Sequence, residues 1–144
     1  MDNKIIIAID AMGGENAPAK NIEGVSLYLN KNKNKKDVFF NLYGDELLIR
    51  KELDKYKISS VLCKIIPSST VVSDEETPLT AIKNSKDSSM WNAINSQIIS
   101  NSNITLSAGN TGVLFVVSRM LLKTIESVSK PALAGLWPNE KNMN

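Results

Sequence analysis

Three short segments of the 144-residue chain combine glycine, hydroxyl, amide and charged side chains in a way that suits anion binding. They are Asp10-Ala11-Met12-Gly13-Gly14, Lys86-Asp87-Ser88-Ser89-Met90 and Ser107-Ala108-Gly109-Asn110-Thr111-Gly112. The third is a glycine-bearing turn that should open into a helix, whose unpaired N–H groups and dipole favour a negative charge. In the first, Asp10 can orient a ligand or a loop, and the glycines allow close approach of the backbone. In the second, Lys86 adds a positive charge beside two hydroxyls.

Each segment also has a purely structural interpretation, which the residues alone leave open. Glycines after a strand commonly satisfy backbone geometry, and Asn110 and Thr111 could simply cap the helix that follows them. Ser88 and Ser89 could do the same, with Lys86 in solvent. Neither glycine turn has the Walker A pattern or the Gly-x-Gly-x-x-Gly spacing of a dinucleotide fold.

Composition excludes several kinds of catalysis. The chain has no histidine, so it cannot supply a Ser-His-Asp or Cys-His pair or an imidazole metal ligand. Its one cysteine, Cys63, excludes an internal disulfide, and we expect a buried, inert thiol. The consecutive acids Asp74, Glu75 and Glu76 would rarely converge on one centre, so no metal site is predicted.

Charge and hydropathy point to neither a nucleic acid nor a membrane span. There are 17 Lys+Arg against 15 Asp+Glu, and the one dense basic run, 31–36, is typical of a solvated loop or of docking to an acidic partner or lipid. The apolar run before Asp10 is too short for a signal peptide, and the apolar run 113–117 is too short to cross a bilayer.

Strand-like runs alternate with helical patterns, which predicts an α/β fold with a mainly parallel sheet. We expect strands at 4–10, 38–44, 62–66, 104–107 and 132–137. We expect helices that begin near Pro18, after Asp45, at Pro78 and after Ser88, and a last helix over 113–123. Ligands of such sheets bind beyond the carboxyl ends of the strands, where two of the three segments lie. The last helix is apolar nearly all round and should therefore be buried, which requires a larger body or a partner chain.

Taken together and in this order, the three segments resemble the bacterial phosphate acyltransferases of phospholipid synthesis, the PlsX type. Lys130-Pro131-Ala132-Leu133-Ala134 resembles a further segment of that family, and the likeness runs from about Ile7 to Trp137. It implies a Rossmann-like three-layer sandwich of the isocitrate/isopropylmalate dehydrogenase-like superfamily. Residues 1–144 would be the N-terminal part of one catalytic domain, without its C-terminal half.

The resemblance implies a reaction in which inorganic phosphate attacks the thioester of an acyl-(acyl carrier protein) and yields acyl phosphate. It also implies a cytoplasmic homodimer that contacts the membrane peripherally through the missing half, with no cofactor and no nucleic acid. The expected catalytic residues are Asn110, Thr111 and Lys86. The expected phosphate- or substrate-binding residues are Asp10, Gly13, Gly14, Ser88, Ser89, Ser107, Gly109 and Gly112. Because the phosphate is itself the nucleophile, this chemistry needs an anion cradle and donors to the oxyanion but no histidine.

Two positions depart from the family pattern, and two other functions compete. Glu15 stands where the family usually has Asp, and Lys130 stands where it has Arg, whose bidentate fork Lys cannot reproduce. With half of the catalytic domain missing, we expect little activity from the chain alone. The first alternative is a non-catalytic α/β fragment that binds phosphate or a partner. The second, a small dehydrogenase or nucleotide-binding domain, is disfavoured by the missing dinucleotide fingerprint.

Overall fold

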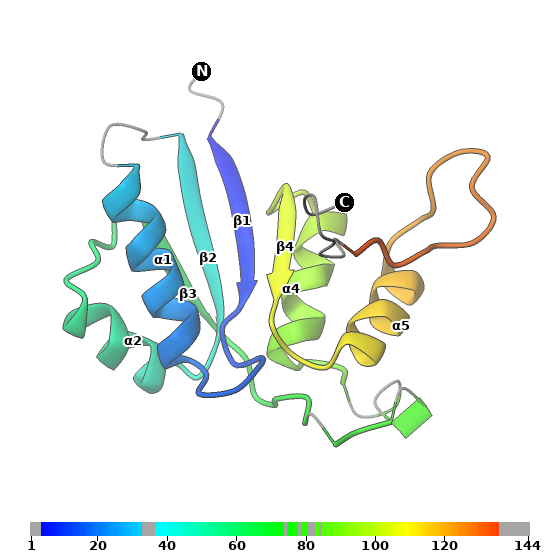
Figure 1. The fold of residues 1–144 in the computed structure, drawn as a ribbon, viewed down its shortest axis with the longest axis horizontal. Helices are drawn as coiled ribbons and strands as arrows, with labels where there is room; N and C mark the ends of the chain where they lie inside the picture. Colours follow the sequence, from blue (N-terminus) through cyan, green and yellow to red (C-terminus); the bar gives the residue numbers. More distant parts are fainter. Residues whose placement is uncertain are drawn as a thin grey trace, which may run out of the picture.

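Four parallel strands form one sheet with helices on both faces (Figure 1). The computed structural model describes residues 4–32, 37–73, 75–77, 79–80, 83 and 85–135. The strands are β1 (Ile5–Asp10), β2 (Val38–Gly44), β3 (Cys63–Pro67) and β4 (Ile104–Ser107), in the order β3-β2-β1-β4. The helices are α1 (Ala19–Lys31), α2 (Glu46–Lys55), α4 (Ser89–Ile98) and α5 (Thr111–Leu121). The α/β class and parallel sheet predicted from the sequence are therefore confirmed.

The strands form where β-branched and aromatic residues run together. β1 pairs with β2 on one side and β4 on the other, as expected for a central strand. Its isoleucines at odd positions face α1 and α2, and Ile9 joins the main core with Ile22 of α1 and Ile49 of α2. On the other face, Ala8 packs with Ala93 of α4. The alternation along β1 thus sends Asp10 to the α4 face, at the carboxyl end of the strand.

The helices begin close to where their capping residues predict. Asp45 caps α2 by accepting a hydrogen bond from the Leu48 backbone N–H at 2.9 Å, and Ser88 caps α4. On α1, Ile22 and Val25 are buried. On α2, Ile49 and Leu53 face the sheet, whereas Leu48 is 46% exposed.

Two expectations about the last quarter of the chain are wrong. Residues 131–135 form no strand, since on the side away from β1 the edge of β4 has no partner among the described residues. The last helix is not buried all round: only Val113 and Val117 are buried, and Met120 is half exposed. Among the described helices, α5 makes its most extensive contacts with α4, which cover one apolar stripe, while Leu114, Phe115 and Val116 are half-buried.

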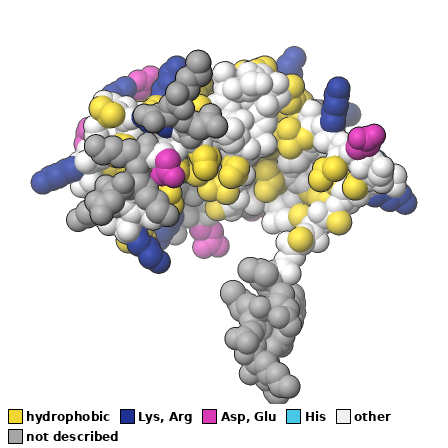
Figure 2. Space-filling model, turned by 90° about the horizontal axis from the view of Figure 1, so that it is seen from above, with side chains coloured by type: hydrophobic (Ala, Val, Ile, Leu, Met, Phe, Trp, Pro, Cys, Tyr) yellow, Lys and Arg dark blue, Asp and Glu magenta, His cyan; other side chains and the backbone are white. Residues whose placement is uncertain are grey.

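Exposed hydrophobic side chains occur over much of the surface. In the view of Figure 2 they lie between charged side chains that project from the periphery. They include Ile104 and Leu106 of the edge strand β4. Among the described residues, no helix has both the length and the apolar character needed to cross a membrane.

Cys63 is a buried thiol, as the sequence predicts. It is 4% exposed at the start of β3, and burial raises the pKa of its thiol. Its Sγ lies 3.7 Å from the backbone carbonyl oxygen of Ser59, to which it donates a weak hydrogen bond. Pro78, where a helix was expected, lies outside the described residues, as do most of the lysine-rich run and Trp137.

Substitution of Leu42 tests how much the core between the sheet and the helices α1 and α2 contributes to the free energy of unfolding. Leu42 is fully buried in β2, so Leu42→Ala should lower the free energy of unfolding by about 2–5 kcal/mol through lost burial and a cavity. Leu47→Ala on α2, where the side chain is 79% exposed, should change it by less than about 0.5 kcal/mol. Urea denaturation measures both, and equal effects would show that this core does not determine stability.

Candidate functional site

The turns that follow β1 and β4 are joined by a hydrogen bond between a buried side chain, Asp10, and a half-buried one, Ser107. Asp10 and Ser107 are opposite each other in the parallel register. The Ser107 hydroxyl donates to Asp10 Oδ2 at 2.7 Å, and the Gly109 backbone N–H donates to Ser107 Oγ at 3.1 Å. Asp10 is only 1% exposed. The first and third sequence segments therefore meet at one edge of the sheet, as predicted from the ends of parallel strands.

Gly13 and Gly14 allow these two turns to touch. A Cβ on Gly13 would lie 2.5 Å from Asp10 Oδ2 and 2.9 Å from the Gly109 nitrogen. Gly14 has a positive φ of 91°, and a Cβ there would lie 2.7 Å from the Ala108 carbonyl oxygen. Glycine is therefore needed at both positions for a structural reason, because the backbones of the two turns approach closely there.

Asn110 fixes the beginning of α5. Its Oδ1 accepts a hydrogen bond from the Val113 backbone N–H at 3.1 Å, which is the capping role considered from the sequence. Its Nδ2 donates to the Glu76 backbone carbonyl at 3.0 Å and so ties the loop after β3 to the same edge. Thr111 and Gly112 follow as the first two residues of α5, and Thr111 is exposed.

The two serines at the beginning of α4 differ in their contacts. Ser88 Oγ accepts a hydrogen bond from the Trp91 backbone N–H at 3.1 Å, so this serine is the helix cap. Ser89 is fully buried, and its Oγ has no hydrogen-bond partner in the described part of the chain. The sequence did not distinguish them, whereas the structure leaves only the Ser89 hydroxyl free of a capping bond.

The second segment also reaches the common edge, through Met90. A Cβ on Gly109 would lie 3.1 Å from Met90 Cε, so the first turn of α4 lies against the glycine turn after β4. Lys86 is exposed in the turn before α4, and no contact places its ammonium group on the glycine turns. All three segments therefore converge, with Lys86 at the periphery.

Two contributors were missed by the sequence reasoning. Asn21 of α1 donates from Nδ2 to the carbonyl oxygens of Ala11 and Gly13, at 2.9 and 3.0 Å, and holds the turn after β1. The backbone carbonyl oxygen of Glu76 accepts the hydrogen bond from Asn110 Nδ2. An isolated asparagine in a helix and a backbone carbonyl in a loop carry no sequence pattern that would have identified them.

Electrostatically, the edge combines two helix N-termini with buried carboxylate oxygens. α4 and α5 both begin here, and their dipoles favour negative charge. Asp10 Oδ1 and Glu76 Oε2 are buried without a hydrogen-bond partner in the described residues. Within that same part of the chain, no three cysteine, aspartate or glutamate side chains gather as metal ligands would. The helix N-termini favour a small anion at their N–H groups, whereas the carboxylates of Asp10 and Glu76 oppose it when they are ionised.

A comparison with known families identifies the family of this chain. The family model described as "Fatty acid synthesis protein" matches residues 5–144. The chain belongs to this family.

Curated relatives carry one name. The chain is 42% identical over 144 residues to the phosphate acyltransferase of Pelagibacter ubique, an alignment that covers 100% of this chain and 42% of that protein. It is 36% identical over 145 residues to the phosphate acyltransferase of Roseobacter denitrificans, covering 99% of this chain and 40% of that protein. The chain thus spans about two fifths of the length of these relatives and corresponds to their N-terminal part.

The two serines of α4 provide a test of the site. Ser88→Ala removes the cap and should lower the free energy of unfolding by about 1 kcal/mol. Ser89→Ala removes a buried hydroxyl without a partner and should leave stability unchanged or slightly raised. Urea denaturation of both variants measures the difference. A larger loss for Ser89→Ala than for Ser88→Ala would show that Ser89 has the structural role.

Proposed function

We propose that this chain forms the phosphate-binding part of a phosphate acyltransferase that transfers an acyl group from acyl-(acyl carrier protein) to inorganic phosphate. The observation that carries the proposal is the convergence of two helix N-termini on a glycine turn fixed by Asp10 and Ser107. Membership of the fatty acid synthesis family and the names of the relatives support the acyl-transfer chemistry.

In the proposed reaction a phosphate oxygen attacks the thioester carbonyl carbon. The carbon–sulfur bond then breaks, acyl phosphate forms, and the thiolate of the carrier protein takes up a proton. Inorganic phosphate brings its own negative charge and its own nucleophilic oxygen, so the chain needs to supply only position and charge stabilisation.

Each residue has a role in this proposal that follows from its contacts. The Thr111 hydroxyl and the first N–H groups of α5 bind phosphate or the developing oxyanion, and the buried Ser89 hydroxyl supplies a further donor. The two hydrogen bonds of Asn110 fix the beginning of α5 and so position these donors. Asp10 acts through Ser107 and Gly109 as a positioning residue, and Lys86 attracts the anion from the periphery.

The proposal also covers the superfamily, the oligomeric state and the location of the enzyme. The parallel order β3-β2-β1-β4 supports a Rossmann-like sandwich, and we assign it to the isocitrate/isopropylmalate dehydrogenase-like superfamily. We further propose a homodimeric, cytoplasmic enzyme that contacts the membrane peripherally through residues beyond the matched two fifths of the relatives. Because the chain spans only that part, a second candidate is phosphate binding without turnover.

Thr111→Val tests the phosphate site. It removes one hydroxyl donor at an exposed position, so folding should be preserved while phosphate affinity falls about tenfold or more, as for a hydrogen bond to a charged group. Isothermal titration with inorganic phosphate measures the affinity. Thr124→Val makes the same change in the exposed segment after α5 and should leave the affinity unaltered. Equal affinities for the wild-type chain and Thr111→Val would contradict the assignment of Thr111.

Hydroxylamine trapping separates the two candidate functions. The chain is incubated with acyl-(acyl carrier protein) and hydroxylamine, with and without phosphate, and acyl hydroxamate is measured. Phosphate-dependent hydroxamate that Thr111→Val abolishes supports the acyltransferase. Phosphate binding with no phosphate-dependent hydroxamate supports the binding fragment.

A further inference from the structure

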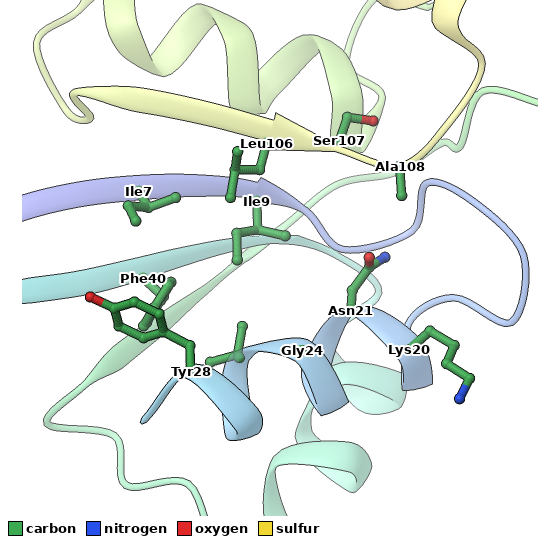
Figure 3. A pocket seen from close by; sticks show the side chains of 11 residues that line it. Ile7, Ile9, Lys20, Asn21, Gly24, Tyr28, Phe40, Leu106, Ser107 and Ala108 are labelled. Atoms are coloured by element: carbon green, nitrogen blue, oxygen red, sulfur yellow. The ribbon is translucent and has the colours of Figure 1, made fainter. Parts of the chain in front are cut away.

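An apolar groove of about 440 Å³ runs along the sheet between α1 and the edge strand β4 (Figure 3). Ile7 and Ile9 of β1 and Leu106 of β4 form its wall on the sheet, and Val25 and Tyr28 belong to α1 opposite. Its volume lies in the range of small-molecule sites. Leu106 is 50% exposed, so the groove leaves apolar surface in contact with water.

Three polar residues of this groove, Lys20, Asn21 and Ser107, lie with Ala108 at the end next to the candidate site (Figure 3). Tyr28 also lines the groove and lies toward the other end. The Ala108 side chain points into the groove, whereas Ser107 turns its hydroxyl away toward Asp10 (Figure 3). Asn21 lines the groove and also holds the turn of Ala11 and Gly13. The groove therefore ends at the turn after β1 and at Ala108, which begins the glycine turn that leads into α5.

Gly24 widens the groove at mid-length. It lies inside α1, where glycine lowers stability relative to alanine. It has no positive φ, and a Cβ on it would meet no atom within 4 Å. Neither its backbone conformation nor packing within the described chain requires glycine, so the space above it is open to an occupant.

We propose that this groove binds the hydrocarbon chain of the acyl group, with the thioester at Ala108 beside the glycine turns. The proposal rests on the proposed function for the identity of the acyl group. From Lys20 to Tyr28 the groove follows α1 for about 12 Å, which suits one extended chain with a polar end.

Gly24→Leu tests this groove with a binding probe, cis-parinaric acid, a fluorescent long-chain fatty acid. Leucine favours helix, so the variant should fold at least as stably as the wild-type chain while its side chain fills the groove. We expect its affinity for the probe to fall about tenfold or more, since excluding about two methylene groups accounts for that factor. Asn30→Leu places the same side chain on α1 outside the groove and should leave the affinity unchanged.

A second apolar groove, between α5 and residues 122–133, serves as a further control. Leu133→Gln makes that groove more polar and should not alter probe affinity. The proposal is overturned if the wild-type chain does not bind the probe, if Gly24→Leu binds it as tightly, or if only Leu133→Gln weakens binding. A further test uses the rest of the Pelagibacter ubique relative, produced separately. If it forms a complex with this chain that excludes the probe, and Gly24→Leu abolishes that complex, the groove is a protein interface and the proposal is overturned.

Phosphate titration of the same variants separates this inference from the proposed function. Gly24→Leu should bind inorganic phosphate as the wild-type chain does, because Gly24 lies away from the α5 N-terminus. Normal phosphate binding with unaltered probe binding would reject the groove alone. If the wild-type chain binds no phosphate and Gly24→Leu still loses affinity for the probe, the groove is supported and the phosphate site is rejected.

Discussion

The carboxylate of Asp10 lies buried at the end of the central strand, and the rest of the site depends on how it is accommodated. A buried carboxylate is costly unless hydrogen bonds compensate it. Ser107 supplies one such bond to Oδ2, and the same hydroxyl then accepts the N–H of Gly109. The bond therefore fixes the direction in which the chain leaves β4, and with it the place where α5 begins. It also explains Gly13, because any larger residue would displace the carboxylate.

This constraint works only because the strands are parallel and in register. Asp10 and Ser107 are opposite partners at the carboxyl ends of β1 and β4. A shift of one residue would turn one of the two side chains to the opposite face of the sheet, where α1 and α2 pack. The apolar pattern of β1 prevents that shift, since it would move Ile9 out of the main core. The hydrophobic core on one face thereby specifies the polar pair on the other.

Sequence reasoning located the strands and caps because these depend on local chemistry. Val38–Gly44 and Ile104–Ser107 were predicted with their observed bounds, and Asp45 caps α2 as expected. The fifth strand and the burial of α5 were mispredicted because both depend on what lies beside them. A strand needs a partner to donate and accept hydrogen bonds, and apolar residues show a tendency to be covered without showing what covers them. Within the site, the meeting of the turns after β1 and β4 could be predicted from parallel topology, whereas the approach of the 86–90 segment and the different roles of Ser88 and Ser89 could not.

The position of α5 shows how the site and the core are coupled. Val113 and Val117 pack against Met90 and Ile94 of α4, and Met90 also lies against Gly109. The two helices that begin at the site are thus joined to each other by one small apolar cluster that is separate from the main core, while α4 also packs on the sheet through Ala93. Asn110 adds a polar link from the beginning of α5 to the Glu76 loop. Because this cluster is smaller than the main core, small changes in it should move the anion-binding N–H groups before they unfold the sheet.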